Sequence, residues 1–167
     1  MLRARMRLTA GVHPRREEPP MVAAIPEPDV RDLMHRAACV PYGLSLIEFG
    51  MPPCVSEMLG VGAEVVLRAR AALADPAIRS DLVGEYEHAV RRRDDDPEAF
   101  CRQCSAEGRV PTPGCPLALI REAEARPSGL ETLRSTELEV AATSFRVHPF
   151  VILGARDWLA RRENAAR

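Results

Sequence analysis

Lysine is absent from this chain of 167 residues, so its 23 basic residues are all arginine. Amide side chains are almost as rare, because asparagine occurs only at Asn164 and glutamine only at Gln103. This bias is typical of a GC-rich genome, and we interpret it as bacterial codon usage. The alternative is that planar guanidinium groups are needed here to bind carboxylates or phosphates.

Aromatic residues are also few, at 4% of the chain. Sandwiches and barrels are rich in aromatic and β-branched residues, so this scarcity, beside abundant Leu, Val and Ala, favours helices packed on helices. With 46% hydrophobic residues, the chain can bury one substantial core but is too short for two ordinary domains. The prediction is an all-α, mostly helical fold with a single domain.

Long apolar runs are missing as well. The longest, residues 145–155, is interrupted by Arg146, His148 and Pro149, whereas a membrane span needs roughly 20 apolar residues in succession. Residues 1–20 contain arginines but lack the apolar segment of a secretory signal. We therefore expect no membrane span and a cytoplasmic location.

The chain carries no excess of charge of either sign, since its 23 basic residues face 24 acidic ones. No overall field would attract nucleic acid, and basic residues gather only in the N-terminal segment and at 91–93, without interleaved aromatics. We do not expect nucleic-acid binding. The five cysteines are an odd number in a chain that is not a small cysteine-dense scaffold, so a disulfide framework is not expected either.

The pattern along the chain predicts a disordered arm at 1–28 followed by one helical domain at 29–167. The arm mixes Arg and Glu with five prolines and cannot bury enough apolar surface to offset its ordering entropy. From Asp29 onward, helical periodicity predicts a compact bundle of about five to seven helices.

Within the bundle, residues 54–74 are predicted to be one long helix, and 42–50 a short strand or an irregular buried loop. Asp75-Pro76 starts a further helix, and the basic block 91–93 followed by the acidic block 94–96 indicates a helix-to-helix junction. The remaining helices are expected at 97–106, 115–126, 137–147 and 149–162, with the last two either separate or kinked at His148-Pro149.

Three cysteines have the spacing of a metal site. Cys101 and Cys104 form a C-x-x-C pair, and Cys115 follows a loop stiffened by two prolines. Zinc sites and iron–sulfur clusters are commonly assembled in this way, from a pair of thiolates and others in the next segment. A closed zinc site needs a fourth ligand, and the candidates are Cys54, Cys39, His88 and His148. We favour Cys54, because the start of a helix lowers a thiol pKa.

Two other interpretations of these thiols remain open. Phe100, Cys101 and Cys104 form an apolar stripe at helical spacing, and unpaired cysteine is among the most buried residue types, so the thiols could be inert core residues. The pair could also be redox-active, although the βαβ context usual for such a motif is missing.

Catalytic signatures are absent: the chain has no G-x-S-x-G, H-E-x-x-H, G-x-x-x-x-G-K-[ST] or G-x-G-x-x-G. His35 lies four residues before Cys39 on a predicted helix, so an imidazole and a thiol could share a face. A thiol-dependent enzyme using Cys39 or Cys54 with His35 is therefore one hypothesis.

The leading hypothesis is a non-enzymatic accessory, assembly or regulatory protein that binds another protein subunit. It rests on the missing catalytic motifs, the apolar segment after His148 and the N-terminal arm. The alternative is a small zinc or iron–sulfur protein, a redox sensor or electron carrier, that uses Cys101, Cys104, Cys115 and Cys54.

Overall fold

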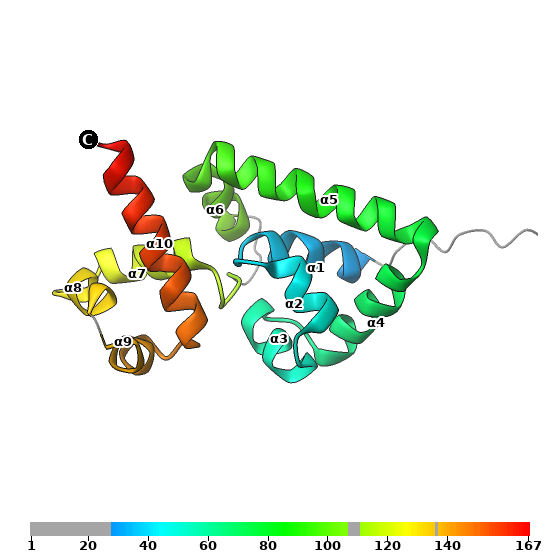
Figure 1. The fold of residues 1–167 in the computed structure, drawn as a ribbon, viewed down its shortest axis with the longest axis horizontal. Helices are drawn as coiled ribbons and strands as arrows, with labels where there is room; N and C mark the ends of the chain where they lie inside the picture. The colour runs from blue at the N-terminus through cyan, green and yellow to red at the C-terminus, as the bar shows by residue number, and fades with distance from the viewer. Residues whose placement is uncertain (1–27, 107–110, 136) are drawn as a thin grey trace, which may run out of the picture.

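A computed structural model describes residues 28–106, 111–135 and 137–167, with side chains at all of these positions except 28 and 103–106. The described residues form α-helices and no strands, which confirms the predicted helical class (Figure 1). The predicted arm at 1–28 lies almost wholly outside them. The helices are α1 (Pro28–Ala38), α2 (Gly43–Phe49), α3 (Pro52–Leu59), α4 (Ala63–Ala74), α5 (Pro76–Asp95), α6 (Pro97–Ala106), α7 (Pro116–Glu124), α8 (Gly129–Arg134), α9 (Leu138–Phe145) and α10 (Pro149–Ala165).

The predicted count of five to seven helices is wrong, because the described residues contain ten. One reason is the segment 42–50, which forms α2 instead of a strand or loop. Gly43 and Ile47 of this helix are buried, four residues apart, and partly buried Leu44 and Leu46 also pack against the first core. A Cβ atom at Gly43 would lie 1.9 Å from the Ala37 carbonyl oxygen, and glycine therefore lets α2 start directly against α1.

The predicted helix at 54–74 is likewise two helices, α3 and α4. Gly60 ends α3 with φ 65° in the left-handed region, where glycine avoids the strain of a Cβ atom. Its N–H donates to the Ser56 carbonyl at 2.9 Å, and the Ser56 hydroxyl donates to the Val61 carbonyl at 2.7 Å. These bonds satisfy the end of α3 locally, so the chain turns where periodicity alone suggested continuity.

The predicted junction after α5 is confirmed. Asp75 caps α5 by accepting a hydrogen bond from the Ala77 N–H at 2.9 Å, and Asp96 does the same for α6 by accepting from the Ala99 N–H at 2.9 Å. His148 separates α9 from α10, and its Nδ1 accepts from the Phe150 N–H at 3.2 Å. Two helices, not one kinked helix, therefore occupy the end of the chain.

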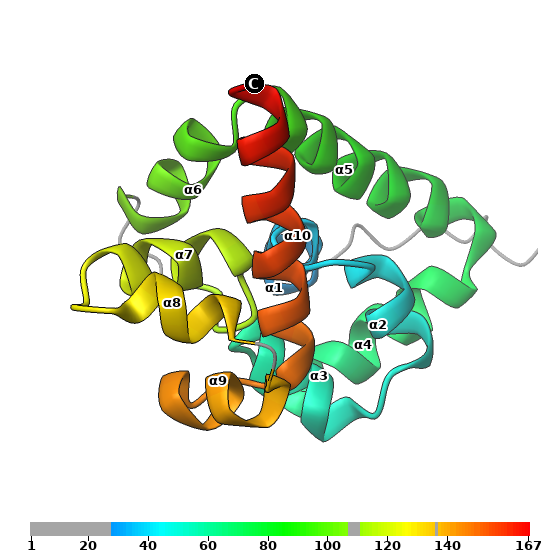
Figure 2. The same ribbon diagram turned by 60° about the vertical axis from the view of Figure 1, so that its left-hand side comes forward.

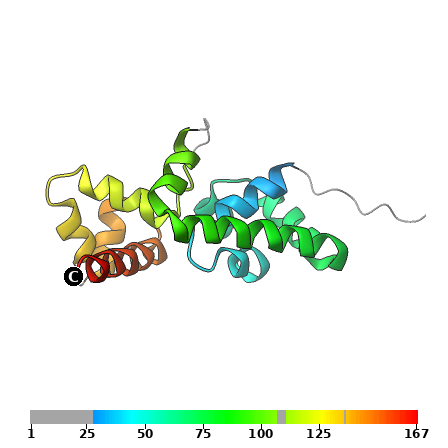
Figure 3. The ribbon, with the colours of Figure 1, turned by 90° about the horizontal axis from the view of Figure 1, so that it is seen from above.

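The helices group into two lobes with separate cores. The first lobe is α1 to α5, where α5 packs along α1, and the second lobe is α7 to α10, where α10 packs against the other three helices (Figures 1 and 2). Seen from above, α6 stands between the lobes (Figure 3). The first core is centred on fully buried Leu33, Met34, Ile47, Leu59 and Leu82, and the second on Leu133, Ala141, Ile152 and Ala155.

Contacts across the lobes come from α3, the loop before α7, and α10. Met58 of α3 packs in the core of the second lobe, and its carbonyl accepts a hydrogen bond from the Gly114 N–H at 2.7 Å. Gly154 of α10 lies so close to Pro41 and Pro116 that a Cβ atom would be 2.8 Å from each ring. The prediction of a single domain is consistent with these contacts and stays a prediction.

Arginine side chains bind the carbonyl groups at the C-terminal ends of helices. Arg93 donates to the Ala38 carbonyl at the end of α1 at 2.7 Å, and Arg36 donates to the Leu59 carbonyl at the end of α3 at 3.2 Å. Carbonyls in the last turn of a helix have no hydrogen-bond partner within the helix, and they carry the negative end of the helix dipole. A guanidinium group supplies both a hydrogen bond and a positive charge. The same contact occurs at α2, α4, α8 and α9, through Arg70, Arg79, Arg156 and Arg126.

Within the described part of the chain, no helix combines the length and apolarity that crossing a membrane requires. This agrees with the interrupted apolar runs of the sequence.

Candidate functional site

Three cysteines from separate parts of the chain meet between α1, α6 and α7. Cys39 follows the last residue of α1, Cys101 lies in α6, and Cys115 is the N-cap residue of α7. Each is buried, with 6% of its surface exposed. We call these three residues the thiol cluster.

The surroundings of the thiol cluster are apolar. Ala38, Ala89 and Phe100 are the other buried residues packed with it, and together they form a small core distinct from those of the two lobes. The Arg92 guanidinium lies 6.0 Å from the centre of the Phe100 ring. Positive charge is also close to Cys39, because Arg93 binds the carbonyl of the preceding residue.

The pKa of the Cys115 thiol is well below its ordinary value. The main causes are hydrogen bonds from the thiols of Cys101 and then Cys39, which stabilise the thiolate. Burial acts in the opposite direction and raises the pKa, while the backbone N–H groups of Ala118 and Leu117 lower it. These amides belong to the first turn of α7, where the helix dipole also favours negative charge. Its surroundings therefore dispose Cys115 to ionise.

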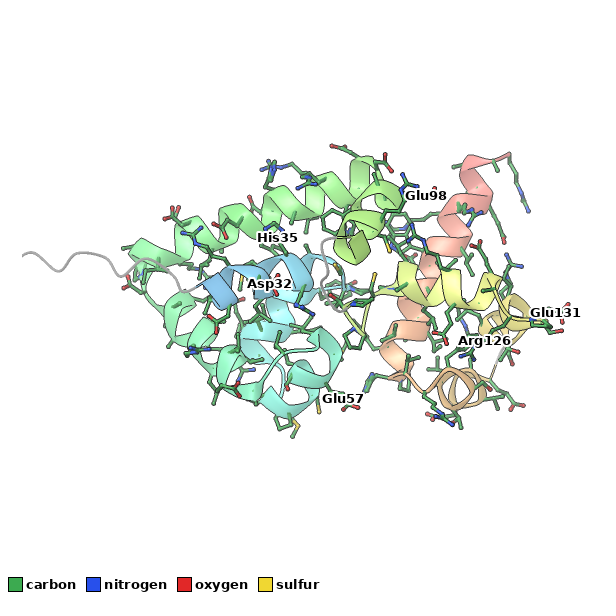
Figure 4. All side chains as sticks on the ribbon, turned by 180° about the vertical axis from the view of Figure 1, so that it is seen from behind. Asp32, His35, Glu57, Glu98, Arg126 and Glu131 are labelled. Atoms are coloured by element: carbon green, nitrogen blue, oxygen red, sulfur yellow. The ribbon has the colours of Figure 1, made fainter. Side chains whose placement is uncertain are left out.

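The structure brings Cys101 and Cys115 together as the sequence suggested, but it places Cys54 elsewhere. Cys54 is exposed and lines a cleft that contains none of the thiol cluster, beside Glu57 and His148. The physical reason is that α3 buries Val55, Met58 and Leu59 against the cores, which turns Cys54 and Glu57 outward. In Figure 4 Glu57 on α3 and Glu98 on α6 lie at opposite edges of the molecule. Among the described cysteines it is Cys39, and not Cys54, that packs with Cys101 and Cys115, while Cys54 as a metal ligand stays a prediction.

The sequence predicts Cys39 only as one alternative for the fourth ligand. The signal that could have favoured it is its place directly after the apolar face of α1, which ends with buried Ala37 and Ala38. The two histidine candidates do not join the cluster: His88 is exposed on α5 and His148 is exposed at the start of α10. Cys104 lies in α6, but its side chain is outside the described set.

The hypothesis of a His35–Cys39 pair stays a prediction. The Cys39 thiol donates to the main-chain carbonyl of His35 at 3.5 Å. This is the ordinary contact of a thiol with the carbonyl four residues earlier in the chain.

The described side chains do not include every predicted metal ligand. Among the described side chains, no group of three or more histidine, cysteine, aspartate or glutamate residues is arranged to hold a metal ion. Cys104 is not part of that set, so the predicted group of Cys101, Cys104 and Cys115 stays a prediction.

Next to the thiol cluster, a cleft of about 440 Å³ opens between the lobes, and we call it the interlobe cleft. Cys39, Tyr42 and Phe150 line this cleft. The ring centres of Tyr42 and Phe150 lie 6.3 Å apart. Trp158 and Arg161 also line the interlobe cleft, and both are shared with a second cleft of about 420 Å³ that Cys101 also lines.

No protein-family model, curated protein or solved structure matches this chain.

Proposed function

We propose that this chain is a non-enzymatic accessory protein that binds another protein at the interlobe cleft. The observation that carries the proposal is the exposure of large apolar side chains at the cleft: Tyr42 is 75% exposed and Leu153 is 50% exposed. An apolar group that stays in water at a concave site gains free energy when a partner covers it.

The backbone of Tyr42 supports this proposal. Tyr42 has φ 54° in the left-handed region, which is unfavourable for a bulky side chain. It precedes α2 without making a side-chain cap hydrogen bond, so glycine or asparagine would suit the turn better. The tyrosine ring makes a tilted contact with Phe150 and lines the cleft. This suggests that the strained backbone is retained because the ring contacts a partner.

The other residues of the cleft fit a protein partner. Trp158 and Arg161 stack, with the guanidinium 6.0 Å from the ring centre, and Arg161 pairs with Asp157 at 2.5 Å. Tyrosine, tryptophan and arginine dominate the binding energy of protein interfaces. A cleft of this volume would accept an apolar side chain of the partner, while the charged pair faces its polar rim.

Site-specific photo-crosslinking in the host tests the proposal. A photo-reactive residue at position 153 should give a covalent adduct with a specific partner, and the same residue at position 67 provides a matched control. Leu67 is 54% exposed on α4 but does not line the cleft. Tyr42→Ala should reduce the adduct at position 153 about tenfold, the effect of losing one interface anchor.

Two outcomes would contradict the proposal. Equal adducts at positions 153 and 67 would mean that the cleft has no selective partner. An adduct consisting only of a second copy of this chain would indicate self-association instead of an accessory role.

A further inference from the structure

We propose that Cys101 and Cys115 are a reversible redox pair, in which a peroxide oxidises the two thiols to a disulfide that links α6 to the start of α7. This is a site of covalent modification, so it goes beyond the proposed protein-binding function and does not depend on it. It also differs from the C-x-x-C pair of the sequence, because Cys115 takes the place of Cys104.

The sulfurs of Cys101 and Cys115 are in contact inside the molecule. Both residues are buried in the same small core, and the Cys101 thiol donates a hydrogen bond to the Cys115 sulfur. Two cysteines can be joined without movement of the backbone only where their side chains already face each other. The hydrogen bond between the two sulfurs shows that these side chains do.

Cys39 is the other neighbour of the Cys115 sulfur, but its thiol has a second acceptor. The Cys39 thiol also donates to the His35 carbonyl at 3.5 Å, so its single proton is divided between a sulfur and the backbone of α1. Cys101, in contrast, lies in a helix that packs directly on α7. The pair that the geometry favours is therefore Cys101 with Cys115, and Cys39 stays a thiol.

Hydrogen bonds hold the backbone on both sides of the pair. Gly114 donates its N–H to the Met58 carbonyl at 2.7 Å, and a Cβ atom at Gly114 would lie 2.9 Å from the same oxygen, so only glycine lets the loop come this close. Arg121 of α7 donates to the Glu98 carbonyl of α6 at 3.2 Å. These contacts keep the two cysteines facing each other, as a preorganised site requires.

A cleft gives a small oxidant access to one sulfur of the pair. Cys101 lines the second cleft, of about 420 Å³, together with Leu117 and Trp158, and this volume admits a molecule as small as hydrogen peroxide. Cys115 lines neither this cleft nor the interlobe cleft. The peroxide therefore meets Cys101 first, and Cys115 reacts with the product.

The reaction takes two balanced steps. In the first, the Cys101 sulfur attacks one oxygen of hydrogen peroxide, the O–O bond breaks, and a sulfenic acid and water form. In the second, the Cys115 sulfur attacks the Cys101 sulfur, the S–O bond breaks, and the disulfide and a second water form. The proton of each thiol ends in the departing water, and the two thiols supply the electrons that reduce the peroxide. A dithiol reductant reverses the oxidation by thiol–disulfide exchange.

Disulfide mapping of the full chain tests the pair. Reduced, metal-free protein is treated with hydrogen peroxide, the remaining thiols are alkylated, and tryptic peptides are analysed by mass spectrometry without reduction. Trypsin cleaves after Arg102 and Arg109, so Cys101, Cys104 and Cys115 fall in separate peptides. The expected result is a cross-linked product that contains Cys101 and Cys115 and that dithiothreitol separates.

Three variants distinguish this pair from the C-x-x-C pair. Cys104→Ser should form the disulfide in the yield of the wild type, and Cys115→Ser should lose it. Cys54 is exposed, so Cys54→Ser is the matched control and should leave the yield unchanged.

A second measurement needs no variant that could fail to fold. The urea midpoint of the oxidised wild type should lie above that of the reduced protein, because a cross-link restricts the unfolded chain. Dithiothreitol should abolish the difference.

The proposal is overturned by any of three mapping results on the wild type. One is a disulfide between Cys101 and Cys104 as the main product, and another is a main product that joins Cys39 to Cys115. The third is the absence of an intramolecular disulfide at a peroxide concentration that oxidises exposed Cys54 fully.

Discussion

At the scale of single residues, Cys54 and Cys115 are cysteines of the same chain in opposite environments. Cys54 is exposed on the first turn of α3, beside a cleft. Cys115 is buried, with two other thiols donating to its sulfur. The chemistry expected of each follows from access to solvent in the first case and from hydrogen bonding in the second.

Alkylation of the native, metal-free protein should therefore distinguish the cysteines by access. We expect iodoacetamide to label Cys54 well before Cys39, Cys101 or Cys115, because a buried sulfur reacts only after local opening. Mass spectrometry of peptides at successive times measures the order. Rapid labelling of Cys39 at neutral pH would instead favour the thiol-enzyme hypothesis.

The lowered pKa of Cys115 predicts a dependence of stability on pH. Because the native thiol ionises at lower pH than the unfolded one, the unfolded chain binds more protons between the two pKa values, and stability rises with pH in that window. The contribution is complete above the unfolded pKa and is lost as pH falls through the native pKa. The slope is at most about 1.4 kcal/mol per pH unit.

Urea denaturation of reduced, metal-free protein at about pH 7 and about pH 8.5 measures this effect. The free energy of unfolding of the wild type should increase over this interval relative to that of Cys115→Ser, which lacks the thiol. Parallel pH profiles of the two proteins would show that the Cys115 pKa is not lowered in the native state.

At the scale of elements, some helices begin or end at close contacts with other helices. Local helix propensity does not predict these contacts. Gly43 starts α2 against the Ala37 carbonyl, and Arg93 binds the end of α1 from α5. In both cases the end of one helix is in close contact with a different helix. Sequence periodicity identifies the buried faces of helices, but it carries no information about such neighbours.

Two glycine substitutions provide a matched test of this point. Gly43→Ala places a Cβ atom 1.9 Å from a backbone oxygen and should destabilise the protein by about 1–3 kcal/mol. Gly84→Ala, in the middle of α5 with no atom within 4 Å of the new Cβ, should stabilise it by about 0.5–1 kcal/mol. Urea midpoints give both values, and a similar effect of the two substitutions would refute the close packing of α2 on α1.

Arg93 tests the role of arginine at helix ends. Arg93→Ala leaves the Ala38 carbonyl without this charged donor and should cost about 1–2 kcal/mol of unfolding free energy. Exposed Arg91, two residues earlier on α5, is the control, and Arg91→Ala should change stability by less than about 0.5 kcal/mol. Thermal denaturation of the two variants decides between a structural use of Arg93 and mere compositional bias.

At the scale of the whole molecule, two lobes with separate cores are linked by the loop before α7 and by α6. Met58 packs in the second core although it belongs to the first lobe, and the thiol cluster lies where α1, α6 and α7 meet. Both candidate sites, the cluster and the interlobe cleft, depend on how the lobes are held together.

We expect the two lobes to unfold in one cooperative transition. Leu33→Ala in the first core and Ile152→Ala in the second, both at fully buried positions, should each shift the whole transition by about 2–5 kcal/mol. Circular dichroism follows all helices, and the fluorescence of Trp158 follows the second lobe. Separate midpoints for the two probes would show that the lobes are independent domains.

The sequence alone determined the helical class, the buried faces of the main helices and the caps at Asp75 and the α5–α6 junction. These features depend on local periodicity and on side chains that bond to nearby backbone. It also singled out Cys101 and Cys115. The break of 54–74 at Gly60 is closed by local hydrogen bonds within residues 56–61, but periodicity did not reveal it. Only the tertiary structure decided that Cys39 joins Cys101 and Cys115 and that Cys54 faces solvent. The physical reason is that these two outcomes depend on contacts between segments distant in the chain, which spacing along the sequence does not encode.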